Sequence, residues 1–572
     1  MITSAFETSA PRAPANPWDR EGRFLRANDA AYQKAAGRIA ESNWRRNPDA
    51  TLAQLELAAR SATRFHSGRF ADGLLENITL EIGRELPTER SDLLDTRSCV
   101  PAATKRHILH VVSAVLGIGG HTRMIQHWIE HDFASCHSVL LIGQGHLPIP
   151  AWLRSTVTTR GGSLLALPAH LSLRAKAVKL RAIATNADLV ILHHGGWDVV
   201  PSLAFAVGDG PPVVVLNHAD HEFWLGSSIA DLVINLRSAA VAHTRERRFI
   251  DRNTVLPIPL GPRSYICNKA EARRRLGIPV SQNVLLSIAR AEKFWPHGNY
   301  DFVGTAGRLL QRIPCAHLYM VGESVDGLRR YFRGALPDRL HLLGVIENPS
   351  LWRAAADVFL ETFPFGSQTS VLEAAQLGVP IVPSYAPLFP LLVANDDSLV
   401  DVLINPDSEE AYIARVEDLV RDPAERERIA EELSQRIQRD HVGEGWIHRL
   451  SQVYAATDHL GHGPHNIPAT TCQSSPADVG LSHWRIMADG RSTAPVDSGD
   501  IDSALLAHRA YVARETHEYV EAVRHAGSVL RKRPLTSAAW RLLLVNALGQ
   551  SATPLRKKYE WLVSTFSNRV SE

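Results

Sequence analysis

The chain has 572 residues, of which 45% are hydrophobic and 21% are charged. This length is too great for a single hydrophobic core, so the sequence predicts several domains. The 62 basic and 60 acidic residues nearly cancel, and a formal charge of +2 gives no electrostatic reason to expect nucleic acid or an anionic membrane as partner. Five cysteines without C-x-x-C spacing are typical of a reducing compartment, not of a disulfide framework.

The sequence shows no targeting or membrane-spanning pattern. The first residues, MITSAFETSAPRAPANPWDREG, lack the apolar core of a secretory signal. No stretch approaches about 18 consecutive apolar residues, the length needed to cross a bilayer. We therefore expect a cytoplasmic protein without a membrane span.

Helical patterns follow a polar N-terminal tail. Residues 1–20 are rich in Ala, Pro, Ser and Asn and are predicted to form a flexible tail. Over residues 21–100 the apolar positions recur at helical spacing, with two amphipathic helices joined near residues 66–68 and ended by Pro87. We expect a helical N-terminal region here.

Two α/β domains are predicted next, over residues 105–260 and 261–457. In the first, the apolar runs HILHVVSAV, SVLLIG, SLLALP, DLVILHH and PVVVLN alternate with helical stretches. In the second, NVLLSIA, AHLYMVG, RLHLLGV, DVFLETF and VPIVP do the same, and a closing helix follows. Continuous apolar runs are typical of parallel strands covered on both faces. The expected fold class is α/β, with two facing doubly wound, Rossmann-like domains and helical additions at both ends.

The C-terminal part is predicted to be a linker followed by helices. Residues 458–500 are polar, with little apolar periodicity, and are predicted to be a linker. Residues 501–572 are predicted to form a helical C-terminal region that resembles a single tetratricopeptide-type hairpin. Such units need stacked neighbours, so a plain helical cap is favoured over a peptide-binding module.

The segment ETFPFGSQTSVLEAAQLGVPIV, residues 361–382, combines a strand exit, a Gly turn and a helix start. The first amides of a helix lack intrahelical partners and lie at the positive end of its dipole, so they can hold a phosphate. Ser367, Gln368, Thr369 and Ser370 add donors at the same place. The alternative is that Ser367 or Thr369 only caps the helix.

This segment resembles the nucleotide-sugar signature of O-GlcNAc transferase-like glycosyltransferases, and it aligns without a gap. It departs from that pattern at Glu361 and Glu373, where Asp is usual, at Gly366, which replaces Asn, and at Gln368. The two-domain retaining group 1 glycosyltransferases have a similar architecture, but their Glu-x7-Glu motif is not met here. The architectural resemblance covers about residues 105–457 and implies the GT-B fold.

The resemblance implies that the second domain holds the nucleotide-sugar donor and that the first domain lies on the acceptor side. Arg290 and Lys293 follow the first strand of the second domain, where such transferases place a basic residue on the donor diphosphate. The alternative is a solvated surface run of charges. Glu373, about one helical turn into the helix, is expected to touch ribose or sugar hydroxyls, and Glu361 completes the predicted donor site.

A glycine loop opens the first helix of the first domain. In VVSAVLGIGGHTRMIQHWI, Gly119 and Gly120 let backbone approach a ligand closely and are assigned to the donor site. The alternative is that a tight strand-to-helix turn needs these glycines for steric reasons alone. His121 either donates a hydrogen bond to the donor phosphate or the acceptor, or caps the helix.

The segment PVVVLNHADHEFWLG ends a predicted strand with polar residues. His218 is the first choice for the base that takes the acceptor proton, with His121 second and Asp220 orienting an imidazole. A structural histidine is one alternative. A metal pair of His218 and His221 is another, but the segment has no Cys partner and no H-E-x-x-H pattern, so no metal is expected. His193 and His194 end a further strand of this domain.

The resemblance implies a metal-independent glycosyltransferase, either hexosyl- or N-acetylhexosaminyl-transferring. It is expected to use a nucleotide sugar of the UDP-sugar class as substrate and to need no cofactor. A glycan, a polypeptide or a lipid-linked sugar is expected as acceptor. A nucleotide-sugar epimerase of the same architecture and a non-catalytic helical scaffold are the alternatives. Inversion and retention of the sugar configuration are both left open.

Overall fold

The computed structural model describes residues 17–89, 105–117, 120–262, 267–296, 300–329, 336–363, 366–385, 396–458, 460–461, 463–488, 506, 508–513, 519–532, 540 and 543. The chain divides into two compact units. The larger unit consists of residues 36–63 and 69–470, and the smaller unit takes the described residues outside those ranges. The larger unit contains both sheets.

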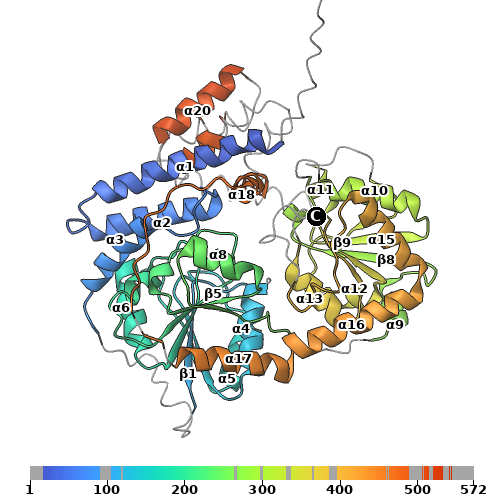
Figure 1. The fold of residues 1–572 in the computed structure, drawn as a ribbon, viewed down its shortest axis with the longest axis horizontal. Helices are drawn as coiled ribbons and strands as arrows, with labels where there is room; N and C mark the ends of the chain where they lie inside the picture. Colours follow the sequence, from blue (N-terminus) through green and yellow to red (C-terminus); the bar gives the residue numbers. More distant parts are fainter. Residues whose placement is uncertain are drawn as a thin grey trace, which may run out of the picture. The chain divides into compact units, whose positions relative to one another are not determined.

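The first sheet of the larger unit has seven strands in the order β3-β2-β1-β4-β5-β6-β7, and all of its pairings are parallel. Helices alternate with the strands and lie on both faces of the sheet (Figure 1). In chain order the elements are β1 (His107–Val112), α4 (Gly120–His131), β2 (Cys136–Leu141), α5 (Ala151–Thr159), β3 (Leu164–Ala166), α6 (Leu173–Ala184), β4 (Leu189–His193), α7 (Val200–Ala204), β5 (Val213–Asn217), β6 (Leu232–Asn235), α8 (Ala239–Arg248) and β7 (Asn253–Val255).

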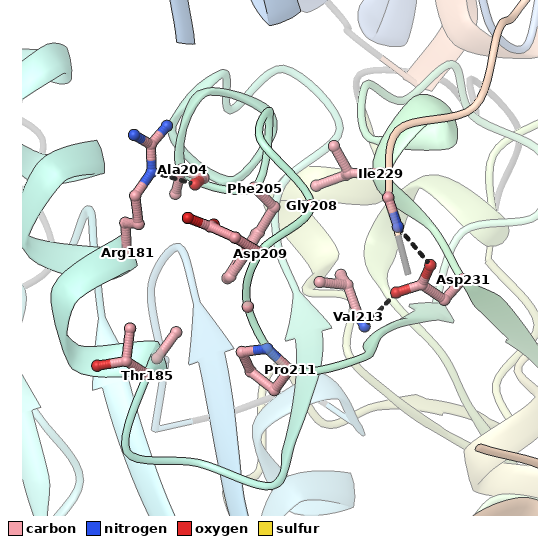
Figure 2. Close-up of a pocket in the computed structure, with 13 residues that line it drawn as sticks. Arg181, Thr185, Ala204, Phe205, Gly208, Asp209, Pro211, Val213, Ile229 and Asp231 are labelled. Atoms are coloured by element: carbon pink, nitrogen blue, oxygen red, sulfur yellow. Dashed lines mark hydrogen bonds between the residues drawn. The ribbon is translucent and has the colours of Figure 1, made fainter. Parts of the chain in front are cut away.

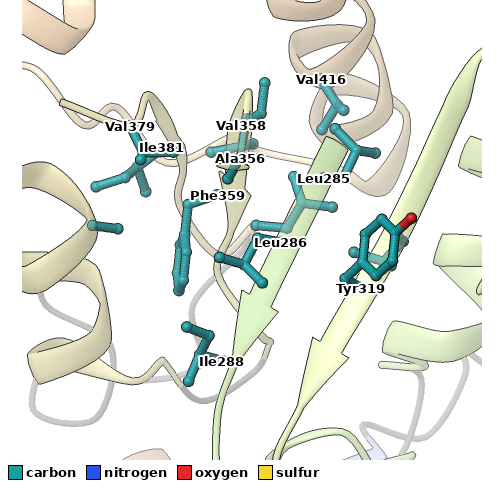
Figure 3. Packing of buried hydrophobic residues seen from close by; sticks show 14 of the residues in the cluster. Leu285, Leu286, Ile288, Tyr319, Ala356, Val358, Phe359, Val379, Ile381 and Val416 are labelled. Carbon is teal, nitrogen blue, oxygen red and sulfur yellow. The ribbon is translucent and has the colours of Figure 1, made fainter. Parts of the chain in front are cut away.

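The second sheet has five parallel strands in the order β10-β9-β8-β11-β12. Its core is continuous, and Figure 3 shows Leu285, Leu286, Phe359 and Ile381 packed between strands and helices. The elements are α9 (Lys269–Leu276), β8 (Asn283–Ile288), α10 (Phe302–Arg312), β9 (Ala316–Val321), α11 (Val325–Leu328), β10 (Leu340–Leu342), α12 (Ser350–Ala355), β11 (Val358–Leu360), α13 (Gln368–Gln376), β12 (Ile381–Val382), α15 (Glu409–Arg421), α16 (Pro423–His441) and α17 (Gly443–Thr457).

The predicted fold class is confirmed, because both halves are doubly wound parallel sheets. All five strands predicted for the second domain are present. The first sheet contains two further strands, β6 and β7, which the sequence analysis did not identify. They span LVIN and NTV, and the polar residues of β7 do not form an apolar run.

The last helix of the second α/β domain returns to the first sheet. Trp446, Leu450 and Val453 on α17 belong to the same hydrophobic cluster as Ile108 of β1 and Trp128 of α4. The indole N–H of Trp446 donates to the carbonyl oxygen of Pro257 at 2.8 Å. The helix therefore joins the two α/β domains through burial of large apolar side chains.

Two N-terminal helices belong largely to the larger unit, α2 (Pro48–Arg64) and α3 (Gly73–Arg84). The helix α3 is tied to the first α/β domain by two buried charged side chains. Arg181 Nη2 donates to the carbonyl oxygen of Gly83 at 2.7 Å. Glu76 accepts hydrogen bonds from the backbone N–H of Gly226 and Ser227 at 2.8 and 3.1 Å. Hydrogen bonding of this kind compensates the burial of a charged group.

The smaller unit holds most of α1 (Pro17–Glu41) together with α18 (Pro476–Ala488) and α20 (Tyr519–Lys532). The helix α18 lies inside the segment predicted as a linker, and that part of the prediction is wrong. Its start is a capping box, because Asp478 N–H donates to Ser475 Oγ at 3.3 Å and Ser475 N–H donates to the Asp478 carboxylate at 3.1 Å. None of the helices among the described residues has the length and apolar character of a membrane span.

Candidate functional site

The start of α13 carries three hydroxyl side chains beside the first amides of the helix. Ser367 occupies the N-cap position, yet its side chain makes no capping hydrogen bond. Ser367, Thr369 and Ser370 are each half-buried. Capping therefore does not account for the hydroxyl of Ser367, and the first-turn amides lie beside it at the positive end of the helix.

Glu361 lies beneath this helix start, directly after β11. Its carboxylate is buried and accepts a hydrogen bond from Ser384 N–H at 3.2 Å. Burial raises the pKa of Glu361 to about 7, against the opposing effects of Ser384 and of the nearby Lys293 ammonium. A methyl group built on Gly366 would lie 1.9 Å from Glu361 Oε1. Two of the four departures from the resembled signature, Glu361 and Gly366, are thus coupled, because the longer acid occupies the space that a side chain at position 366 would need.

Replacing Gly366 by alanine should lower the free energy of unfolding by about 1–3 kcal/mol, the usual cost of overpacking a buried site. Shortening the acid in the double variant G366A/E361D should recover much of that loss, because the clashing oxygen is withdrawn. Urea unfolding of the wild type, both single variants and the double variant measures the coupling. If the loss in the free energy of unfolding of the double variant equals the sum of the losses of the two single variants, the proposed packing of Gly366 against Glu361 is contradicted.

Lys293 lies at the same helix start, whereas Arg290 does not. Lys293, in the short helical turn Ala291–Lys293, is half-buried and donates from Nζ to the carbonyl oxygen of Gly366. Burial, with the added effect of the Arg290 cation, lowers the pKa of Lys293 to about 8. Arg290 is 73% exposed and pairs with Glu292 at 2.9 Å. Of the two predicted cations, Lys293 is the one held at the start of α13.

Two other predicted donor residues are engaged within the second α/β domain. Glu373 forms an ion pair with the buried Arg353 of α12. Gln368 Nε2 lies 3.4 Å from Asp396 Oδ2, a long hydrogen bond. Glu373 is therefore a fixed carboxylate, while the Gln368 amide is only weakly held.

Arg237 is a further cation at this place that the sequence analysis missed. It follows β6, and its guanidinium donates to Asp220 Oδ2 from Nε at 2.9 Å and from Nη2 at 2.7 Å. The positive charge of Arg237 acts to lower the pKa values of both Lys293 and Glu361. This cation of the first α/β domain therefore lies near the start of α13 in the second. Burial alone would raise the pKa of Asp220, but Arg237 and His221 together outweigh this and hold it well below its usual value.

The Asp220 carboxylate contacts Arg237 and His221, and it has no hydrogen bond to His218 or His121 among the described residues. Besides Arg237, its carboxylate lies 3.3 Å from Nδ1 of His221. The ring that is hydrogen-bonded to His218 is that of His193, whose Nδ1 lies 3.1 Å from His218 Nε2. Burial, followed by the His121 ring, keeps the pKa of His218 well below its usual value, so its imidazole is neutral.

Gly120 and His121 open α4 beside these residues, and the predicted Gly119 lies outside the described residues. A methyl group built on Gly120 would lie 2.9 Å from Thr369 Oγ1, so glycine permits the close approach of α4 to the start of α13. His121 Nε2 is buried and has no hydrogen-bond partner among the described residues. Burial lowers the pKa of His121 to about 4, so this ring is also neutral.

The structure brings together three imidazoles that are near enough to raise the question of a metal ion. One ring nitrogen from each of His121, His193 and His218 lies within 4.8 Å of the other two. At zinc–nitrogen distances of about 2.0–2.1 Å in a tetrahedral site, the centroids of two ligand rings lie roughly 5 Å apart. The centroids of His121 and His218 are 3.8 Å apart, so these two rings do not converge on one tetrahedral ion. The trio does not fit a zinc site.

A separate hollow lies at the other edge of the first sheet. Figure 2 shows it between Arg181, Asp209 and Ile229, and Val213 N–H donates there to Asp231 Oδ2 at 2.7 Å. Val213 begins β5 and Asp231 precedes β6, so the hollow is at the amino ends of these strands. None of the predicted site residues lines it.

Comparison with known proteins identifies one matching family model and several solved structures of similar fold. Residues 282–422 match the family model "Glycosyl transferases group 1". Comparison with curated protein sequences gives no match. Among solved structures, the chain is similar to an O-GlcNAc transferase mutant of Thermobaculum terrenum, with 15% identity and a TM-score of 0.47 over 83% of this chain and 86% of that chain.

The chain is also similar to HepE of Anabaena in complex with UDP and glucose, with 15% identity and a TM-score of 0.47 over 61% of this chain and 100% of that chain. A third similar structure is sucrose-phosphate synthase from Thermosynechococcus elongatus, with 15% identity and a TM-score of 0.46 over 61% and 99% of the two chains. The matched family model spans β8 to α15 and includes the start of α13. Residues 282–422 form a group 1 glycosyltransferase domain.

Proposed function

We propose that the protein transfers a glycosyl group from a nucleotide sugar, of the UDP-sugar class, to a hydroxyl- or amide-bearing acceptor. The observation that carries this is the start of α13, where uncapped first-turn amides, the hydroxyls of Thr369 and Ser370 and the Lys293 ammonium gather. The uridine nucleotide is proposed from the resemblance of residues 361–382 to the O-GlcNAc transferase-like signature. A hexose or an N-acetylhexosamine is the proposed sugar.

In the proposed reaction the bond between the sugar and the diphosphate breaks, and negative charge develops on the leaving diphosphate. Helix amides and a fixed ammonium stabilise that charge without having to reorganise during the reaction. The lowered pKa of Lys293 in the protein without donor matches this role, because an incoming diphosphate restores the protonated form. Glu373, held by Arg353, is proposed to bind ribose or sugar hydroxyls.

On the acceptor side, His218 is proposed to take the acceptor proton, and His121 is the second choice. Both imidazoles are neutral at physiological pH, the state that a general base needs. Asp220 is proposed to hold Arg237 beside the donor charges, since its carboxylate contacts that guanidinium instead of His218. No metal ion or cofactor is assigned a role in these steps.

The double variant Thr369→Val with Ser370→Ala tests the proposal. Each hydrogen bond to a charged group contributes on the order of 1.5–3 kcal/mol, so the dissociation constant of UDP should rise by about tenfold or more. Calorimetric titration with UDP measures this, and thermal unfolding checks that the fold is intact.

A true helix cap in the same domain supplies the matched control. Ser408 Oγ accepts from Ala411 N–H at 3.2 Å at the start of α15. Ser408→Ala should therefore lower stability and leave UDP binding unchanged. If the Thr369/Ser370 variant behaves like Ser408→Ala, its hydroxyls belong to the helix and the donor-site proposal fails.

A further inference from the structure

Four histidines run diagonally across the first sheet, three on neighbouring strands and the fourth directly after the next strand. His137 of β2 pairs in register with Ile108 of β1, and His110 stands two residues beyond Ile108. His110 pairs with Ile191 of β4, and His193 stands two residues beyond Ile191. A step of two residues keeps side chains on one face of a strand, so the three rings share a face. His218 continues the diagonal just past the end of β5.

The rings of this diagonal are hydrogen-bonded head to tail. His193 Nδ1 lies 3.1 Å from His218 Nε2, His193 Nε2 lies 2.9 Å from His110 Nδ1, and His110 Nε2 lies 2.9 Å from His137 Nδ1. The side chains of His110, His137 and His193 are fully buried. The series uses both nitrogens of every inner ring. The direction of the protons is therefore decided at its ends.

Asp132, just after α4, ends the series. Its Oδ2 lies 3.2 Å from His137 Nε2, which is an ion-pair contact and not an aligned hydrogen bond, and accepts from the Tyr454 hydroxyl at 2.8 Å. Its Oδ1 accepts from the backbone N–H of Ala134 and Ser135, at 3.2 Å each. Burial alone would raise the pKa of Asp132, but His137 and the other donors outweigh this and lower it to about 2. The group is an ionised acceptor.

We propose that Asp132, His137, His110 and His193 form a relay that fixes the tautomer of His218; the catalytic meaning of this inference rests on the proposed function. A carboxylate only accepts, so His137 carries its proton on Nε2 and accepts at Nδ1. In the same way, His110 and His193 each carry their proton on Nε2 and accept a hydrogen bond at Nδ1. His218 is left with the proton on Nε2 and a lone pair on Nδ1, for which the structure gives no partner among the described residues.

This arrangement makes Nδ1 of His218 the atom that receives the acceptor proton. When it does so, the acceptor oxygen or nitrogen forms its bond to the sugar carbon, the diphosphate leaves with the electron pair of the broken bond, and His218 becomes a cation. The series of acceptors ending in Asp132 stabilises that cation through the Nε2 proton. Asp132 is a positioning residue that acts through three other rings, in the way that a buried aspartate orients a catalytic histidine.

The variant Asp132→Asn separates orientation from packing. The amide oxygen must stay on the Ala134 and Ser135 N–H groups, which need an acceptor, so the amide nitrogen takes the Oδ2 place and donates to His137. Every ring of the relay then reverses, and His218 carries its proton on Nδ1. We expect kcat to fall roughly 100-fold, since the base no longer has its lone pair toward the acceptor. UDP binding should change by less than about twofold.

Histidine-labelled protein allows the tautomer to be read directly from two-bond proton–nitrogen correlation spectra, with His218 assigned from its absence in His218→Gln. The wild type should show His218 protonated on Nε2, and Asp132→Asn should show it protonated on Nδ1. Asp231→Asn is the matched control, because Asp231 is a buried first-domain aspartate that accepts from Val213 N–H outside the relay. It should leave the His218 spectrum and kcat unchanged.

A wild-type spectrum with the His218 proton on Nδ1 overturns the relay, and this reading does not depend on whether Asp132→Asn folds. An unchanged His218 tautomer in Asp132→Asn overturns it as well. Neither reading needs sugar transfer, so failure of the relay and failure of the proposed function are distinguished. A protein that shows the predicted tautomers but turns over no nucleotide sugar contradicts the function and retains the relay.

Discussion

Replacing Lys293 by alanine should raise the dissociation constant of UDP by roughly 10- to 100-fold, because one charge-assisted hydrogen bond at a phosphate contributes about 1.5–3 kcal/mol. The ammonium is half-buried and is held at the carbonyl oxygen of Gly366, where α13 begins. Arg290→Ala is the matched control, since Arg290 is 73% exposed and paired with Glu292, and exposed pairs contribute little. Equal binding by wild type and Lys293→Ala would remove this residue from the donor site.

The lowered pKa of Lys293 adds a pH dependence to the same site. With a pKa of about 8, the ammonium is charged below that pH and is lost as pH rises above it. UDP affinity should therefore be nearly constant up to about pH 7 and fall by about tenfold between pH 7 and 9. Lys293→Arg, whose guanidinium stays charged throughout this range, should give a flatter profile. Parallel slopes in the two proteins would assign the pH dependence to another group.

Replacing His218 by alanine should lower kcat by about 10²- to 10⁴-fold, the usual contribution of a general base, and leave UDP binding nearly unchanged. UDP binding should be unchanged because His218 belongs to the first α/β domain, whereas the proposed phosphate contacts belong to the second. His221→Ala serves as control, because its ring contacts Asp220 and takes no part in the relay.

Steady-state kinetics at saturating donor, paired with UDP calorimetry, measures both quantities for His218→Ala. A loss of UDP affinity that matches the loss of turnover would move His218 to the donor side. Unchanged turnover would leave His121, whose Nε2 is buried without a partner among the described residues, as the proposed base.

The strands were predictable where burial on both faces gives an unbroken apolar run. NVLLSI of β8 and AHLYMV of β9 are such runs. β7, with the sequence NTV, pairs at the sheet edge and carries no such signal. The helix α18 was missed although Ser475 and Asp478 have the spacing of a capping box, because the flanking composition is polar.

The start of α13 could be predicted from the sequence, because its signals lie in one continuous segment. Arg237, His110 and His137 could not, because their place in the site depends on packing between distant segments. The start of α13 is a continuous segment in which glycine, hydroxyls and a helix pattern coincide. Arg237 is separated from Lys293 by 56 positions in the chain, and only the packing of α4, β6 and α13 brings first-domain groups to it. His110 and His137 read as ordinary strand positions, and only the register of neighbouring strands reveals the diagonal that joins them to His218.

The measurement that tests the central claim most directly is turnover of a panel of nucleotide sugars, followed by separation of the nucleotide and sugar products. Glycosyl transfer predicts release of free nucleotide, most strongly from a UDP-sugar, in equal amount to sugar joined to an added acceptor, and loss of this activity in Lys293→Ala. Recovery of an isomerised nucleotide sugar would instead indicate an epimerase. A folded protein that consumes none of the donors, over a panel of glycan, polypeptide and lipid-linked acceptors, would contradict the account.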